Sequence, residues 1–217
     1  MLRLAHRGDW RRVPENSLEA LTAAMDVPGC DGVEFDVRLS HDDVPVLVHD
    51  ATLARVQHRH ARVDALTAAE LDESGVATLA AVLAALPGAF LDIELKGEDH
   101  GVATADVLRA GRGGHPTRAV VSSFEAPALA AMADLLPEWP RWLNATDLHP
   151  QTISLAKGLG CRGLSVLWGS ITPAALRTAG SVGLEVAAWT VTRRPTFERL
   201  ARLGVVAACT EGSALDG

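Results

Sequence analysis

The chain has 217 residues, of which 48% are apolar and 22% are charged, and its net charge is −7. These fractions are typical of a folded soluble protein and exclude a disordered, collagen-like or disulfide-scaffold chain. The acidic balance argues against a nucleic-acid partner, which would require a basic face. An acidic chain can still hold a small positive pocket, so an anionic small-molecule substrate stays open.

The length predicts one domain over residues 1–217, because a chain of this size buries roughly 70% of the surface that it exposes when unfolded. The three cysteines, Cys30, Cys161 and Cys209, are widely spaced and form no CxxC pair. They therefore argue against a disulfide framework and a thiolate zinc site. The sequence begins without an apolar signal core and has no apolar segment long enough for a bilayer. We therefore expect a cytoplasmic protein without stable membrane insertion.

Short apolar runs alternate along the chain with helix-length segments. The runs predicted as strands are residues 2–6, 32–38, 90–96, 119–124, 141–145, 163–167, 185–191 and 205–210. The segments predicted as helices are residues 16–25, 79–86, 102–110, 127–135, 151–159, 173–179 and 195–203. Strand–helix alternation favours parallel pairing, and this number of units predicts an α/β fold of the TIM (β/α)8 barrel type. A doubly wound open sheet is the alternative, but the glycine-rich phosphate loop typical of it is absent after the first strand.

One further strand does not fit this alternation. Residues 44–49 read as a strand, yet only residues 39–43 separate them from the second strand. A parallel partner would need a crossover of a dozen or more residues. We therefore expect a short antiparallel extension at one mouth of the barrel. Residues 51–75 follow as a small insertion with one short helix.

Charged side chains alternate with apolar ones in two of the predicted strands. Glu34 and Asp36 share one face of the second strand, and Asp92, Glu94 and Lys96 share one face of the third. Helices cover the outside of a parallel barrel, so these charges point into its interior. Carboxylates this close repel unless a cation lies between them, and an all-oxygen site suits Mg²⁺ or Ca²⁺ better than Zn²⁺. Alternatively, Lys96 neutralises Glu94 as a structural ion pair.

Histidines mark the ends of two predicted strands beside these acids. His6 ends the first strand and is followed by Arg7, whose planar guanidinium suits a phosphate group. His49 ends the fold-back strand. Because histidine exchanges protons near neutral pH, both are candidates for acid–base chemistry. The histidines expected to be solvated are His41, His58, His60, His100, His115 and His149, of which His58 and His60 could instead border the site.

Several motifs occur in one order over nearly the whole chain. They are HRG (6–8), PENS (14–17), GVEFDVRLSHDDVPVLVHD (32–50), TLAAVL (78–83), IELK (93–96), SSF (122–124) and AWTV (188–191). Together they resemble the glycerophosphodiester phosphodiesterase family. The resemblance implies a TIM-barrel hydrolase that converts glycerophosphodiesters to glycerol 3-phosphate and an alcohol with the help of a divalent cation.

The resemblance also implies roles for individual residues. It implies metal ligands at Glu34, Asp36 and Glu94, an acid–base pair at His6 and His49, and phosphate contacts at Arg7 and Lys96. It further implies an aromatic wall at Trp189, with Phe124 in the same pocket, although Trp189 could instead serve barrel packing. Asn16 either caps the first helix together with Glu19 or holds a metal ligand or water. Glu15 either supports the site in the same way or has a purely structural role.

This mechanism agrees with elementary chemistry, because attack on an anionic phosphodiester needs charge neutralisation. One histidine would activate the nucleophile and the other would protonate the leaving alkoxide. The fold-back position favours His49 for the leaving group.

The sequence departs from the family pattern in several places, none of which falls on a proposed metal or acid–base residue. Ala80 and Ala81 stand where acids are usual, Thr192 replaces an asparagine, and Glu211–Gly212 replaces an Asp and a following proline. The short insertion predicts an open mouth. Two alternative functions follow. One is hydrolysis of lysophospholipids, which requires an apolar groove. The other is a non-catalytic barrel that binds phosphoesters.

Overall fold

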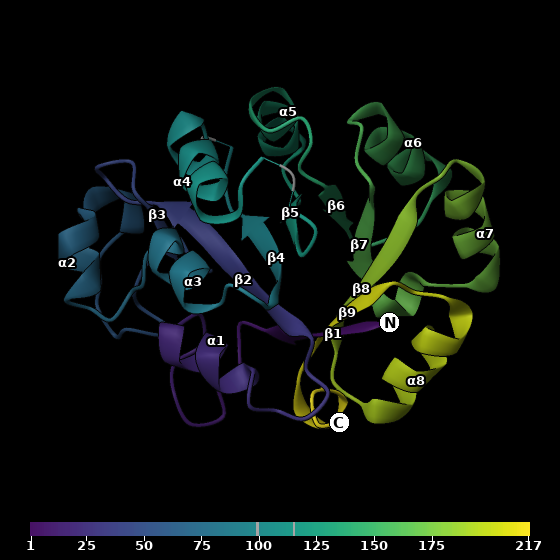
Figure 1. The fold of residues 1–217 in the computed structure, drawn as a ribbon, viewed down its shortest axis with the longest axis horizontal. Coiled ribbons are helices and arrows are strands. Elements are labelled where there is room, and N and C mark those ends of the chain that lie inside the picture. Colours follow the sequence, from purple (N-terminus) through teal and green to yellow (C-terminus); the bar gives the residue numbers. More distant parts are fainter. Residues whose placement is uncertain (99, 115) are drawn as a thin grey trace.

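A computed structural model describes residues 1–98, 100–114 and 116–217. Within these residues one sheet has the strand order β1-β9-β8-β7-β6-β5-β4-β2-β3, and a β1–β2 pairing closes it into a barrel (Figure 1). All pairings around the barrel are parallel, which confirms the predicted TIM barrel. The strands are β1 (Leu2–His6), β2 (Gly32–Leu39), β3 (Pro45–Leu47), β4 (Phe90–Leu95), β5 (Ala119–Ser123), β6 (Arg141–Ala145), β7 (Gly163–Leu167), β8 (Glu185–Val191) and β9 (Ala207–Thr210).

Helices surround the barrel as an outer ring (Figure 1). They are α1 (Leu18–Ala24), α2 (Ala68–Asp72), α3 (Leu79–Ala85), α4 (Val102–Arg112), α5 (Ala126–Leu135), α6 (Pro150–Gly158), α7 (Pro173–Ser181) and α8 (Arg194–Leu203). Short 3₁₀ helices are η1 (Val63–Ala65), η2 (Trp168–Ser170) and η3 (Gly212–Ala214). Proline in the first turn of α5, α6, α7 and α8 suits these helix starts, because its missing N–H would be unpaired there in any case.

The first helix begins later than the sequence predicts. Ser17 caps α1, with its Oγ accepting a hydrogen bond from the Ala20 N–H at 3.1 Å. Asn16 precedes the cap with a φ of +56°, in the left-handed region. The interpretation of Asn16 and Glu19 as a capping pair is therefore wrong.

Strand β3 turns back on β2, as predicted. It pairs antiparallel with β2, with Val37 opposite Leu47. The insertion after it contains η1 and α2 and has an apolar core of its own, separate from that of the barrel. This core contains Val46, Val48, Leu53, Val63, Leu71 and Val76. The insertion is thus a small packed unit that supports β3 at the edge of the barrel mouth.

The alternation along β2 divides its side chains between two environments. Val33, Phe35 and Val37 are fully buried in the main apolar core. Glu34 and Asp36 point the other way, into the barrel, and are buried as well. Because helices cover the outside of a parallel sheet, a charged residue on such a strand can be accommodated only in the interior. The predicted inward direction of these acids is thus confirmed.

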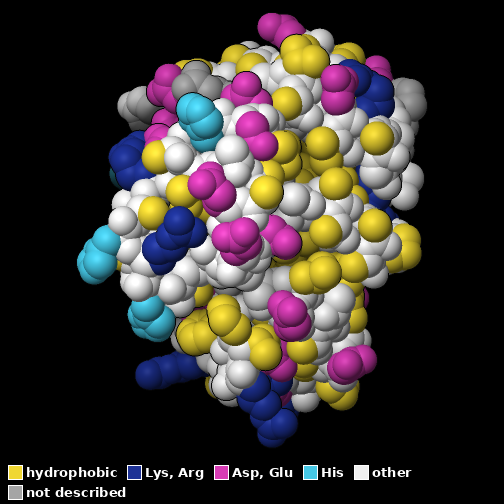
Figure 2. Space-filling view, turned by 90° about the vertical axis from the view of Figure 1, so that its left-hand side faces the viewer, with side chains coloured by type: hydrophobic (Ala, Val, Ile, Leu, Met, Phe, Trp, Pro, Cys, Tyr) yellow, Lys and Arg dark blue, Asp and Glu magenta, His cyan; other side chains and the backbone are white. Residues whose placement is uncertain are grey.

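Charges of both signs are interspersed with apolar side chains on the side of the molecule where α2 lies (Figure 2). His41, His58, His60 and His149 are exposed as predicted. His100 is the exception, since it is only 2% exposed and its Nε2 lies 3.1 Å from the Lys96 carbonyl oxygen. The expectation that His100 is solvated is wrong, because its ring lies against the Lys96 carbonyl and the Thr104 hydroxyl instead of in solvent. His115 lies outside the described residues. Among the described helices, none combines the length and apolar character needed to cross a membrane.

Candidate active site

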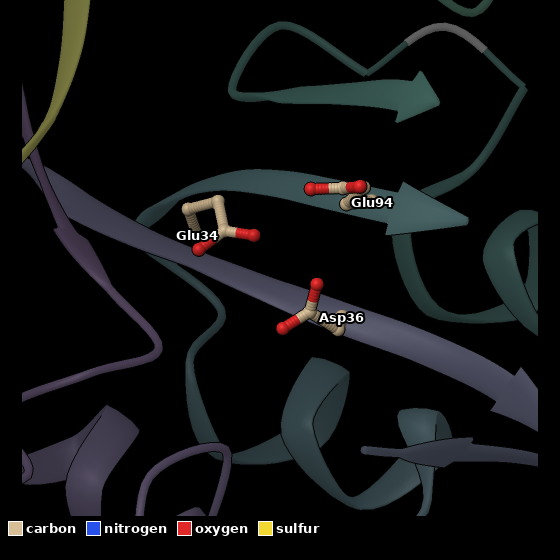
Figure 3. Close-up of side chains that lie close together, drawn as sticks. All are labelled: Glu34, Asp36 and Glu94. Carbon is tan, nitrogen blue, oxygen red and sulfur yellow. The ribbon is translucent and has the colours of Figure 1, made fainter. Parts of the chain in front are cut away.

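Strand register brings the acids of β2 and β4 together. Glu34 lies opposite Asp92, and Asp36 lies opposite Glu94. Glu34, Asp36 and Glu94 each offer one oxygen, and these three oxygens all lie within 4.8 Å of one another (Figure 3). The three residues are 3%, 1% and 8% exposed. The predicted carboxylate cluster is therefore present, and it is almost closed to bulk water.

The electrostatics of this cluster are unfavourable without a further cation. Burial, together with the charges of Asp36 and Glu94, raises the pKa of Glu34 well above its usual value. Burial also raises the pKa of Glu94, against the influence of Lys96, and raises the pKa of Asp92 to about 7. Burial acts in the same direction on Asp36, but nearby cations, Lys96 foremost, outweigh it and lower its pKa. A cation bound among these side chains would favour the ionised carboxylates and so lower the pKa values of Glu34, Asp92 and Glu94.

Two cationic side chains already lie among the carboxylates. Lys96 Nζ forms ion pairs with Glu94 and, at 3.1 Å, with Asp36 Oδ1. Arg7 Nε lies 3.1 Å from Asp36 Oδ2. The structural ion pair between Lys96 and Glu94 is thus present. It does not satisfy the whole cluster, because Glu34 Oε1 is buried without a hydrogen-bond partner among the described residues.

Asn16 forms two hydrogen bonds with Asp36, one of the three clustered acids. Its Nδ2 donates to Asp36 Oδ2 at 2.8 Å, and its Oδ1 accepts the Asp36 backbone N–H at 3.1 Å. These two contacts fix both the side chain and the backbone of Asp36. The left-handed backbone of Asn16 is what turns its amide from α1 toward β2. The interpretation that Asn16 supports a carboxylate of the cluster agrees with this geometry.

Glu15 holds the Arg7 side chain from the other side. Its Oε1 accepts hydrogen bonds from Arg7 Nη1 and from Arg55 Nη2, both at 2.7 Å. Gly8, next to Arg7, has a φ of +85°, and a Cβ there would lie 2.5 Å from a backbone carbon of Ala20. Only glycine therefore lets α1 approach the end of β1 closely enough for these contacts.

His6 projects from the end of β1 between two acids. Its Nδ1 lies 2.5 Å from Glu211 Oε1, and its Nε2 lies 3.8 Å from Glu34 Oε2. The short contact with Glu211 favours a proton on Nδ1 and leaves Nε2 directed at the carboxylate cluster. Glu211 directly follows β9, which pairs with β1. The atypical end of the last strand therefore supplies the carboxylate that contacts His6.

His49 follows β3 and is held in a similar way. Its Nδ1 lies 2.7 Å from Asp50 Oδ1, and Asp50 Oδ2 accepts a hydrogen bond from Arg55 Nε at 2.6 Å. Burial lowers the pKa of His49 below its usual value, although Asp36 and Asp50 act against this. Burial therefore favours the neutral form of this imidazole. Its Nε2 is the ring nitrogen left to exchange a proton with a ligand.

A cavity of about 230 Å³ opens at the end of the barrel where these residues meet. One wall is aromatic, because Phe124 and Trp189 meet edge to face with ring centroids 5.5 Å apart. Trp189 Nε1 donates to the Ser165 carbonyl at 3.0 Å, so the ring belongs to the cavity wall and not only to barrel packing. The predicted site residues that line the cavity are His6, Arg7, Glu34, His49, Glu94, Lys96, Phe124 and Trp189. Asp36, Asn16 and Glu15 support them from behind.

Sequence reasoning missed several polar residues of this site. Glu211 and Asp50 orient the two histidines, and Asn144 and Ser165 line the cavity from β6 and β7. A signal existed for each pair. Glu211 stands at a departure from the family pattern, and Asp50 follows His49 in the sequence. Asn144 and Ser165 are polar residues in short apolar strands, which is typical of positions that face a site.

A parallel barrel with buried acids, two histidines and two cations at the C-terminal ends of its strands has the organisation of a TIM-barrel hydrolase for an anionic substrate. A model of the glycerophosphoryl diester phosphodiesterase family matches residues 6–214. The chain belongs to this family and is an enzyme of the glycerophosphodiester phosphodiesterase class.

Individual relatives agree with this assignment. A glycerophosphodiester phosphodiesterase of Caldanaerobacter subterraneus subsp. tengcongensis is 25% identical over 93% of this chain and 90% of its own length. The structure of a phosphodiesterase from Oleispira antarctica, in complex with the product sn-glycerol-3-phosphate, matches with a TM-score of 0.86 and 26% identity. That match covers 97% of this chain and 92% of the other. A glycerophosphodiester phosphodiesterase from Agrobacterium tumefaciens shares the fold, with a TM-score of 0.84 and 23% identity over 99% and 98% of the two chains.

Proposed function

We propose that this enzyme hydrolyses small glycerophosphodiesters to glycerol 3-phosphate and an alcohol, with one divalent cation held by Glu34, Asp36 and Glu94. The observation that carries the proposal is the convergence of these three buried carboxylates within 4.8 Å. We further propose that residues 1–217 act as one domain, because the first strand, β1, closes the barrel by pairing with both β2 and the last strand, β9.

The cluster fits a hard divalent ion. All candidate ligands are oxygens, which suits Mg²⁺ or Ca²⁺. Glu34 Oε1 is buried and has no hydrogen-bond partner among the described residues, so an acceptor is available. When bound, the cation would neutralise charge on the nonbridging oxygens of the phosphodiester.

The protein's own groups supply the remaining steps. Arg7 and Lys96 border the cavity and would bind the phosphate oxygens. His6 and His49 would act as the acid–base pair, with Glu211 and Asp50 fixing their orientation. One histidine takes the proton of the attacking water or of a neighbouring substrate hydroxyl. The phosphorus–oxygen bond to the alcohol breaks, and the other histidine donates a proton to the leaving alkoxide.

The reaction and its cation are tested together by measuring glycerol 3-phosphate release from glycerophosphocholine and glycerophosphoethanolamine. We expect EDTA to abolish turnover and either Mg²⁺ or Ca²⁺ to restore it. Restoration by one cation would identify the metal. Full activity in EDTA would contradict the metal proposal, and no activity with any cation would contradict the proposed substrate class.

A second substrate class is favoured by one observation. A largely apolar groove of about 380 Å³ is lined in part by Trp10, Leu215 and Glu211, the residue that contacts His6. Trp10 is 42% exposed there. Such a groove could hold the acyl chain of a lysophospholipid next to His6. Hydrolysis of lysophosphatidylcholine, reduced in Trp10→Ser, would support this class. Equal activity of both proteins on glycerophosphocholine is the control.

Removal of the Asn16 side chain is expected to weaken cation binding. Asn16→Gly keeps the left-handed backbone available but deletes both hydrogen bonds to Asp36, so we expect divalent affinity to fall roughly 10- to 100-fold. In Asn16→Ala we expect the cation affinity to fall by the same factor. This variant should also lose about 1 kcal/mol of folding stability, because alanine disfavours the left-handed backbone conformation. Calorimetric cation titration and thermal melts of both variants provide the measurement. Unchanged affinity in Asn16→Gly would limit Asn16 to a structural role.

Loss of the carboxylate beside His6 is expected to lower turnover. In Glu211→Gln a neutral amide oxygen replaces the negatively charged acceptor of the His6 Nδ1 proton and no longer stabilises the imidazolium form, so we expect kcat to fall roughly 10- to 100-fold with little change in KM. Glu211→Asp should retain more activity than the glutamine variant, since it keeps the charge. Steady-state kinetics on glycerophosphocholine measures both. A larger loss in Glu211→Asp would indicate that side-chain length matters more than charge.

A further inference from the structure

The cavity wall across from the carboxylate cluster carries two polar side chains that the proposed mechanism does not use. Asn144 lies on β6 and Ser165 on β7, and they are 6% and 2% exposed. In the closed strand order, β6 lies four positions from β1, and β7 lies four positions from β2. The two side chains therefore face His6 and Glu34 across the cavity, which all four residues line.

The amide of Asn144 is unsatisfied by the described part of the protein. Its Oδ1 is buried and has no hydrogen-bond partner there. Buried polar groups are normally paired, so an unpaired one that borders a cavity points to a ligand. Two neighbouring polar groups, the Ser122 hydroxyl and the Trp189 indole, are already engaged. Ser122 Oγ donates to Asp92 Oδ1 at 2.6 Å, and the Trp189 indole donates to the Ser165 carbonyl at 3.0 Å.

We propose that Asn144 and Ser165 bind the hydroxyl groups of the glycerol part of the substrate. This inference rests on the proposed function and assigns an orientation to the diester. The phosphate lies by Arg7 and Lys96, the polyol points across the barrel, and the leaving alcohol faces the open mouth. A primary amide offers both a donor and an acceptor, and a hydroxyl offers the same pair, so together they match a vicinal diol.

The remaining walls fit this orientation. Phe124 and Trp189, which flank β6 and β7 in the barrel, present ring surfaces to the carbon skeleton of the polyol. Phe124 is 43% exposed and so borders the mouth as well. The enclosed polyol site therefore discriminates among phosphoesters by their hydroxyl groups. The alcohol, which lies at the open side, contributes little to selection.

The inference is tested by calorimetric binding of sn-glycerol 3-phosphate and of propyl phosphate, which has the same carbon chain without hydroxyls. Both titrations are made on the full chain with the activating cation present. We expect the wild-type protein to prefer sn-glycerol 3-phosphate roughly 10-fold or more, because each unmatched buried polar group disfavours the deoxy ligand. Asn144→Leu keeps the size of the side chain. In this variant the ratio of the affinities for sn-glycerol 3-phosphate and propyl phosphate should approach one. Ser165→Ala should lower it in part.

Phe124→Leu is the matched control, because it removes ring contact that both ligands share. It should weaken both ligands by a similar factor and keep the preference between them. An unchanged preference in Asn144→Leu and Ser165→Ala would overturn the inference, while continued hydrolysis of glycerophosphocholine by the wild-type protein would leave the proposed function standing. Absence of that hydrolysis in the wild type would instead overturn the proposed function. If Asn144→Leu fails to fold, Ser165→Ala alone decides the inference.

Discussion

Glu34→Ala is expected to abolish hydrolysis and cation binding while leaving the barrel intact. Glu34 is 3% exposed, and burial beside Asp36 and Glu94 raises its pKa well above the usual value. Deleting one of several crowded acids relieves repulsion, and the space left opens onto an existing cavity. We therefore expect the stability of the cation-free variant to lie within about 1 kcal/mol of wild type, or slightly above it.

Thermal melts with and without cation separate the two effects. At a cation concentration of about 100 times Kd, binding stabilises the native state by about 2.7 kcal/mol. For a chain of this size that corresponds to a rise in Tm of roughly 5–10 °C. Wild type should show this rise and Glu34→Ala should not. Asp92→Asn is the matched control, because Asp92 is an equally buried acid next to the cluster but outside the three proposed ligands, and it should keep the rise in Tm.

The outcomes are distinct. Unfolding of Glu34→Ala would mean that Glu34 has a structural role and that the proposed cation site is wrong. Loss of the rise in Tm in both Glu34→Ala and Asp92→Asn would mean that the ion responds to the charge of the whole cluster and not to three defined ligands.

Most of the fold follows from local pattern. The runs at residues 141–145, 163–167 and 185–191 form strands with the predicted bounds, because apolar strands between amphipathic helices have few alternative partners. The reversed β3 was predictable from chain length alone, since five residues cannot cross between parallel strands. Helix starts were less predictable. Asn16 and Ser17 are both good capping residues, and only the contacts of Asn16 with Asp36 decide between them.

The site was predictable as far as strand alternation reaches. Alternation assigns Glu34, Asp36 and Glu94 to the interior without any knowledge of register. It cannot indicate that β9 brings Glu211 against His6, because that contact joins residues 205 positions apart. It also cannot distinguish His100 from the exposed histidines, since burial of a loop residue depends on how the loop folds back. The roles of the site residues came from the resemblance to a family, whereas contacts such as that of His6 with Glu211 depend on which strands pair in the folded barrel.

His49→Ala is expected to keep cation affinity and to lose most turnover. His49 lies outside the three-carboxylate cluster, and its partner Asp50 retains an ion pair with Arg55 at 2.6 Å, so the local structure should survive. If His49 is a general acid or base, kcat should fall by roughly 10²- to 10⁴-fold. At 1.36 kcal/mol per factor of ten, this is a loss of about 2.7–5.4 kcal/mol of transition-state stabilisation.

The leaving group distinguishes the two roles of His49. An alkoxide such as that of choline needs a proton as it departs, whereas p-nitrophenolate is stable without one. If His49 protonates the leaving group, His49→Ala should lose activity on glycerophosphocholine but retain most of it on a p-nitrophenyl phosphodiester. If it activates the nucleophile, both substrates should suffer alike. His41→Ala, a change at an exposed histidine after β2, is the control. Wild-type turnover of both substrates by His49→Ala would remove His49 from the mechanism and leave His6 with Glu211 as the proton-transfer pair.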